Sequence, residues 1–169
     1  MERGPTIKSL TEDTNKFLHK KIKEKVFGAI HSAPHLEDIQ LISLNKKDKD
    51  NEEKIDKLLD KSTIEAENLH EYKLILETIG LSEDEIKDLL AHENAHANKA
   101  ESLGAKHLSY KITIMIDKNN NYLYQPFSHI YIPEEWSDEK VKDTWVKIAK
   151  APEEYGNKMS SSDIEMSQE

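Results

Sequence analysis

The spacing of the apolar residues changes at Gly104, and this change constrains the fold more than any other feature of the sequence. Before Gly104 the apolar residues recur at helical spacing. After it they alternate with polar residues, as in a strand that buries one face. The alternating residues are Leu108, Tyr110, Ile112, Ile114 and Ile116. The change of period predicts an α+β fold.

Two amphipathic runs precede Gly104, each with signals for a helix start and a helix end. The starts are capping-box pairs, and the ends are glycines at positions where a left-handed C-cap is expected. The pairs are Ser62 with Glu65 and Ser82 with Glu85, and the glycines are Gly80 and Gly104. These signals predict helices over 63–79 and 83–103. The short loop between them makes the pair antiparallel.

A β-hairpin is expected after the second helix. The segment DKNNN (117–121) has turn chemistry, because asparagine tolerates positive φ. A returning strand over 122–132 contains Pro126, which is typical of an edge strand. The sequence thus predicts a helical body that carries a β-hairpin.

The remaining segments complete one predicted α+β domain over 12–151. An N-terminal helix runs over about 12–32 and stops before Pro34, and a C-terminal helix follows the Trp136–Ser137 cap and ends before Pro152. Residues 36–44 fit a short strand or a helical turn, and residues 45–53 fit a charged linker or a solvated helix start. Residues 1–11 are predicted to be an N-terminal tail, and 152–169 a disordered C-terminal tail.

Composition and charge exclude several classes of protein. The net charge is −9, without a basic stripe that could follow a phosphate backbone, so nucleic acid is not expected as a partner. The chain has no cysteine, so a metal must be held by His, Asp or Glu. No signal-peptide pattern or membrane-spanning apolar run is present. We expect a soluble cytoplasmic protein, and the sequence does not indicate an oligomeric state.

The segment HENAH (92–96) carries the strongest indication of chemistry. Two histidines four residues apart on a helix lie on nearly the same face, one turn apart, so His92 and His96 can reach one ion. Glu93 can then activate a metal-bound water as a catalytic base. Glu93 and His96 also fall within the predicted buried stripe, where a carboxylate usually has a cation or another partner. This spacing favours a metal site.

This segment, with ANKAESLG after it, resembles the active-site helix of zincin-type zinc metallopeptidases, and its later Ala and Leu-Gly also resemble site-2-type peptidases. The resemblance covers about fourteen residues. It implies that His92 and His96 bind zinc (Zn²⁺), that Glu93 is the general base, and that a peptide or protein is the substrate. It departs from both groups, because the chain has no membrane segment and its clear strands follow the helix.

Catalytic zinc needs a third protein ligand. Glu101 faces away from His96 around the helix, and Ser102 occupies the position of the third histidine in the extended metzincin pattern. The hairpin brings His129 level with His96, although the face on which it lies depends on a one-residue choice of register. We therefore expect His129 as the third ligand, with His70 as the next candidate. Tyr110 or Tyr131 could donate to an oxyanion.

Two other classes of function remain as alternatives to a zinc-dependent hydrolase. The motifs Glu67-x-x-His70 and Glu93-x-x-His96 on packed helices are a feature of ferritin-like di-iron bundles. A non-catalytic interaction module is the other alternative, because a tyrosine-rich edge strand could pair with a partner's sheet. Its tyrosines are Tyr122, Tyr124 and Tyr131.

Overall fold

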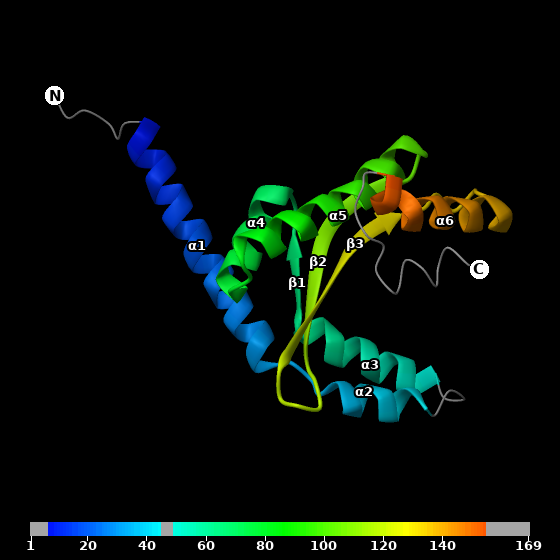
Figure 1. Ribbon diagram of the computed structural model, residues 1–169, viewed down its shortest axis with the longest axis horizontal. Helices are drawn as coiled ribbons and strands as arrows, with labels where there is room; N and C mark the ends of the chain where they lie inside the picture. Colours follow the sequence, from blue (N-terminus) through cyan, green and yellow to red (C-terminus); the bar gives the residue numbers. More distant parts are fainter. Residues whose placement is uncertain (1–6, 45–48, 155–169) are drawn as a thin grey trace. The chain divides into compact units, whose positions relative to one another are not determined.

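The computed structural model describes residues 7–44 and 49–154, which form six helices and a three-stranded antiparallel sheet (Figure 1). This confirms the predicted α+β class and the hairpin after the motif helix. In chain order the elements are α1 (Ile7–His31), α2 (Leu36–Ser43), α3 (Lys49–Lys61), β1 (Thr63–Ala66), α4 (Leu69–Ile79), α5 (Glu83–Ser102), β2 (Lys106–Ile116), β3 (Tyr122–Tyr131) and α6 (Asp138–Glu154).

The chain divides into two compact units. The first unit comprises Met1–Ile64 and Ile114–Tyr122, and the second comprises Glu65–Thr113 and Leu123–Glu169. The first unit therefore contains α1, α2, α3 and the turn of the hairpin. The second unit contains α4, α5, α6 and most of β2 and β3, and it holds the HENAH segment.

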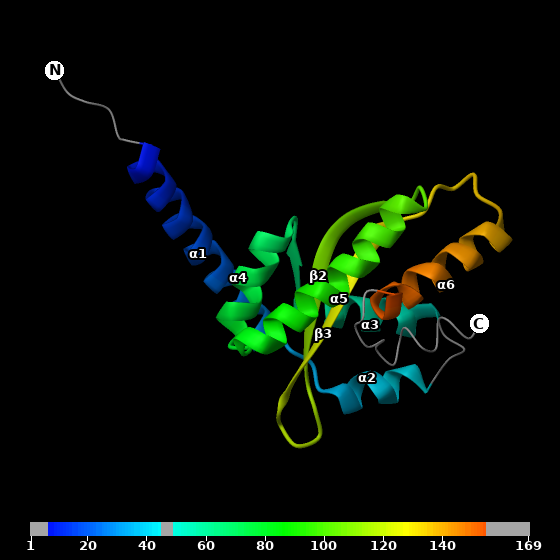
Figure 2. The same ribbon diagram turned by 45° about the horizontal axis from the view of Figure 1, so that its top comes forward.

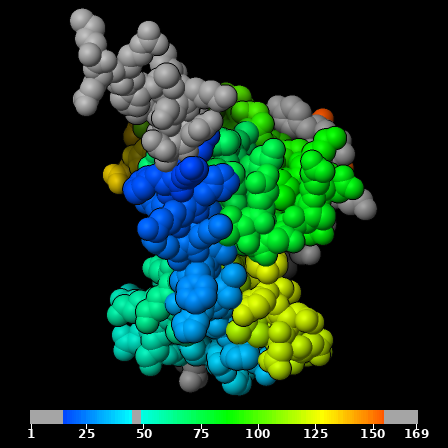
Figure 3. All heavy atoms as spheres, turned by 90° about the vertical axis from the view of Figure 1, so that its left-hand side faces the viewer, coloured from blue at the N-terminus to red at the C-terminus, as the bar shows by residue number. Residues whose placement is uncertain are grey.

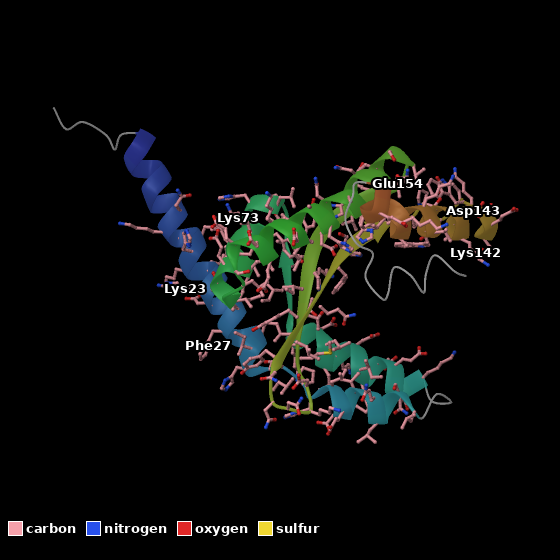
Figure 4. All side chains as sticks on the ribbon, viewed as in Figure 1. Lys23, Phe27, Lys73, Lys142, Asp143 and Glu154 are labelled. Atoms are coloured by element: carbon pink, nitrogen blue, oxygen red, sulfur yellow. The ribbon has the colours of Figure 1, made fainter. Side chains whose placement is uncertain are left out.

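In the first unit, α1 ends at His31, before Pro34, as predicted. Its face at Ile22, Val26 and Ala29 is buried, whereas Phe27 is 70% exposed. Figure 3 shows α1 in blue, and Figure 4 labels Phe27 on this helix. Residues 36–43 form the helix α2, which decides between the two forms that the sequence allowed.

The charged segment over 45–53 is helical from Lys49, where α3 begins, and residues 45–48 lie outside the described part of the chain. The same applies to most of the two predicted tails. Residues 7–11 belong to α1, and residues 152–154 belong to α6. The prediction that the last helix ends before Pro152 is therefore wrong, because α6 continues through this proline to Glu154.

The sheet has the order β1-β2-β3, so β3 is an outer strand. This order confirms the edge position that was predicted from Pro126. The predicted turn is also confirmed. The Asp117 N–H donates to the Asn121 carbonyl at 2.8 Å, and Asn120 adopts a φ of 62°.

The predicted helix over 63–79 is wrong at its start, because Thr63–Ala66 forms β1 and α4 begins only at Leu69. Asn68 is the N-cap: its side chain accepts a hydrogen bond from the Glu71 N–H at 2.9 Å. The Glu71 side chain in turn accepts the N–H of Glu67, the residue before the cap, at 3.0 Å. The Ser62 hydroxyl instead donates to the Leu59 carbonyl at the end of α3.

We expect Asn68→Ala to lower the free energy of unfolding by about 1 kcal/mol, because the Glu71 N–H loses its side-chain acceptor. Asn68→Asp keeps a carboxylate oxygen in the capping position and should lose much less. Urea unfolding of the two variants measures the difference. An alanine variant as stable as the native chain would show that the cap at residue 68 does not stabilise α4.

In the second unit, α5 packs against both α4 and α6 and lies beside β2 and β3 (Figure 2). The capping box at its start is confirmed, because the Ser82 hydroxyl accepts the Glu85 N–H and donates to the Glu85 carboxylate. Gly80 and Gly104 both have positive φ, as predicted. None of the described helices combines the length and the apolar character needed to cross a membrane.

An apolar cluster lies where α5 contacts α6. Ala100, Ala105 and Ile148 are its buried residues, and Trp136 and Trp145 are among the partly buried side chains that pack against them. Because alanine adds little bulk, the backbones of the two helices can approach closely here. An ion pair between Lys99 and Glu154, at 3.1 Å, also joins the two helices; Figure 4 labels Glu154 near the end of α6.

Candidate metal centre

The histidine and glutamate side chains of the HENAH segment form a group that could hold a metal ion. His92, Glu93 and His96 each offer one ligand atom, and these atoms lie within 4.8 Å of one another. All three residues are on α5, and the side chains of Glu93 and His96 are buried. The grouping predicted from the sequence is therefore present in the fold.

The two imidazoles approach each other through the same ring atom. The Nε2 of His96 lies 3.1 Å from the Nε2 of His92, and the ring planes stand at 83° to each other. Two nitrogens bound to one tetrahedral zinc at about 2.0–2.1 Å would be separated by about 3.3 Å. The arrangement of the two rings therefore fits two ligands of a single ion with little adjustment.

The second nitrogen of His96 is held by α6. Its Nδ1 lies 2.7 Å from the carbonyl oxygen of Ile148, and the His96 side chain is only 8% exposed. A carbonyl can only accept, so Nδ1 carries the proton, and in the neutral imidazole Nε2 keeps a lone pair. A backbone carbonyl on the far nitrogen is a common way to orient a metal-binding histidine. The packing of α6 on α5 thus presents the His96 Nε2 to His92.

Glu93 lies between α5 and the sheet, and only 2% of it is exposed. The hydroxyl of Ser128, on β3, donates to its Oε2 at 2.9 Å. Burial raises the pKa of both Tyr72 and Tyr110, and the negative charge of Glu93 raises each pKa further. Both tyrosines therefore keep their protons at neutral pH. The hydroxyl groups of Ser128, Tyr72 and Tyr110 that lie near Glu93 therefore all carry their protons.

The two tyrosines are held in place by contacts with each other and with β2. The Tyr72 hydroxyl donates to the Lys111 carbonyl at 3.2 Å, and its ring stacks on that of Tyr110 at 5.4 Å. Tyr110 is close enough to Glu93 for the charge of that carboxylate to raise its pKa. Of the two tyrosines suggested as oxyanion donors, Tyr110 is therefore beside Glu93, whereas Tyr131 is 48% exposed.

His129, the expected third ligand, is not in the group formed by His92, Glu93 and His96. Its side chain is exposed, and its neighbour Ser128 is the residue that reaches Glu93. Successive side chains of a strand point to opposite faces, so His129 is on the other face of β3. His129 is close enough to His107 to lower the pKa of that residue.

The other candidates from the sequence are not members of this group either. Glu67 and His70 are exposed, and Glu67 precedes α4 instead of lying on it. Among the described residues, the group suited to a metal does not include the second Glu-x-x-His motif that a di-iron bundle requires. Glu101 is exposed and accepts the His107 N–H at 2.8 Å.

The sequence analysis did not identify Ser128, Tyr72 or Ile148 as part of the site. Ser128 could have been found only with the register of the hairpin, which selects it in place of its neighbour His129. Ile148 contributes a backbone carbonyl, which every residue has, so its identity leaves no sequence signal. The buried position of Tyr72 in α4 was consistent with a core residue.

We expect the chain to lose stability as the pH falls below 6.5, in part through His107. Burial lowers the pKa of His107, and this effect outweighs the opposite effect of Glu101. A histidine whose pKa is lower in the folded chain binds fewer protons than in the unfolded chain. Its contribution is complete above the ordinary value of 6.5 and declines below it.

The measurement is urea unfolding on either side of pH 6.5 for the native chain and for His107→Gln. The glutamine variant should lose less stability on acidification, because it has no imidazole to protonate. His70→Gln, at an exposed position on α4, is the control and should retain the native response. An unchanged slope for His107→Gln would contradict the prediction.

No family model, curated protein or solved structure matches this chain. The class is therefore defined by the fold and the site alone. It is an α+β chain whose long helix α5 bears a possible metal-binding His-Glu-His group beside a β-hairpin.

Proposed function

We propose that this protein is a zinc-dependent hydrolase that cleaves peptide bonds. The observation that carries the proposal is the approach of the two Nε2 atoms of His92 and His96 to 3.1 Å, with the buried carboxylate of Glu93 beside them. Imidazole ligands suit zinc, and zinc lowers the pKa of a bound water to near neutrality. The same residues occupy the roles that the resemblance to zincin-type peptidases implies.

In this proposal each residue of the site has a distinct task. His92 and His96 would provide two of the three protein ligands that catalytic zinc needs, and the Ile148 carbonyl orients His96. Glu93 takes a proton from the attacking water and returns it to the leaving amine. The Ser128 hydroxyl, which donates to one carboxylate oxygen, holds Glu93 in position.

The burial of Glu93 supports a cation at this place. Removing a carboxylate from water costs several kcal/mol, so a buried carboxylate usually has a cation or another partner nearby. A divalent ion within reach of the same side chain would offset much of this cost. The burial of the Glu93 carboxylate and the positions of the two imidazoles thus both favour a divalent metal ion at this site.

The first test is elemental analysis of native protein that has been purified without a chelator or a metal-affinity tag. We expect about one zinc per chain, and its removal by a chelator should be reversible. The variant His129→Asn decides whether this histidine contributes to the site. Protein that contains no zinc and takes up none on addition would rule out the proposed function.

The second test concerns the substrate. A mixture of unstructured peptides should be cleaved by the zinc-loaded protein at neutral pH, and chelation should stop the cleavage. The products identify the bond that is broken. A zinc-loaded protein that cleaves no peptide would restrict the function to metal binding.

A further inference from the structure

Pro152 lies inside α6 and is fully buried. In an α-helix each backbone N–H donates to the carbonyl of the residue four positions earlier. For residue 152 this partner is the carbonyl of Ile148. Proline has no N–H, and its ring also pushes against the carbonyl four positions earlier. Pro152 therefore removes the helical donor of Ile148 and no other.

The Ile148 carbonyl is the same group that the metal site uses. It accepts the hydrogen bond from the His96 Nδ1 at 2.7 Å, and both residues are buried. A buried carbonyl without its helical donor would cost free energy if it had no other partner. Pro152 on α6 thus leaves the Ile148 carbonyl without a helical donor, and the His96 Nδ1–H on α5 donates to this carbonyl instead.

We propose that Pro152 is a positioning residue of the candidate metal centre. By leaving the Ile148 carbonyl available, it holds His96 in the tautomer that has its proton on Nδ1 and its Nε2 lone pair directed at His92. The effect on the tautomer depends only on the contact between α5 and α6. The effect on metal binding also rests on the proposed function.

Restoring an N–H at position 152 should weaken the contact without abolishing it. A carbonyl oxygen has two lone pairs, so the Ile148 oxygen can accept a second hydrogen bond. The helical bond would, however, draw this carbonyl back into line with the axis of α6 and away from His96. Loss of an outer-shell partner of a ligating histidine typically lowers metal affinity by about 10–100-fold. For the variants at position 152 we expect a loss of zinc affinity near the lower end of this range, about tenfold.

The experiment compares the native chain with Pro152→Ala and Pro152→Val. Both variants restore the N–H, and valine also keeps most of the volume of the buried ring. Nitrogen chemical shifts of the His96 ring in the metal-free chain report its tautomer. Zinc affinity is measured by competition with a chelating dye, and thermal unfolding reports stability. We expect less of the Nδ1–H tautomer, about tenfold weaker zinc binding, and a midpoint of unfolding that does not fall in the valine variant.

The combination of weaker binding with undiminished stability separates positioning from a merely structural role. The control is Pro133→Ala, which also gains an N–H but lies before α6, where no helical carbonyl is affected. A native tautomer in both variants at position 152, or loss of folding in both, would overturn the inference. If the native chain binds no zinc, the proposed function fails, and the tautomer measurement alone still tests the role of Pro152.

Discussion

Replacing Glu93 with glutamine is expected to lower the rate of peptide hydrolysis by about 10²–10⁴-fold while zinc remains bound. Glutamine has nearly the same shape as glutamate and still offers an oxygen to the Ser128 hydroxyl, so the fold should be retained. It cannot accept a proton, so the attacking water is no longer activated. Hydrolysis is followed with the peptide identified in the substrate test, and zinc is measured in the same samples.

This variant also separates two roles that the geometry allows for Glu93. Its carboxylate is close enough to the two imidazole nitrogens to bind the ion directly. If Glu93 is a ligand, the glutamine variant should lose zinc together with activity. If it is the base, only activity should fall. Glu101→Gln, at an exposed position on the same helix, is the control and should retain both. Full activity of Glu93→Gln would contradict the proposed mechanism.

Replacing His96 with alanine is expected to have two separate effects. Zinc affinity should fall by more than the roughly 10–100-fold that loss of an outer-shell partner costs, because an ion ligand is removed. In the presence of a chelator, the free energy of unfolding should also fall by about 1–3 kcal/mol. The second effect arises because the buried Ile148 carbonyl loses the hydrogen bond from Nδ1.

The matched variant is His92→Ala, one turn earlier on α5. It should weaken zinc binding to a similar extent, because it removes the other imidazole. His92 is only half-buried, so its loss should cost the metal-free chain less stability than the loss of His96 does. Urea unfolding with and without zinc measures both effects. Equal losses of stability in the metal-free variants would show that the contact between His96 and Ile148 contributes little.

The parts of the fold that the sequence predicted correctly depend on neighbours in the chain. The capping box of Ser82 and Glu85, the positive φ at Gly80 and Gly104, and the turn at 117–121 each involve residues within a few positions. The spacing of His92 and His96 belongs to this group as well, because one helix alone brings the two rings together. For these features local geometry leaves few alternatives.

The start of α4 shows where local signals compete. The sequence analysis placed the cap at Ser62 with Glu65, but Asn68 with Glu71 has the same spacing. Residues Thr63–Ala66 pair with β2, which removes them from the helix and leaves Asn68 as its cap. Strand pairing with a distant segment therefore decided between two caps of similar intrinsic strength.

The sequence by itself determined an α+β chain with two imidazoles and a carboxylate gathered on one helix, because helical geometry depends only on spacing. The tertiary structure alone decided what surrounds them. The parity of the hairpin register turned Ser128 toward Glu93 and His129 to the opposite face. The packing of α6 brought the Ile148 carbonyl to His96. Such contacts join residues far apart in the chain, and their energies depend on how whole elements pack.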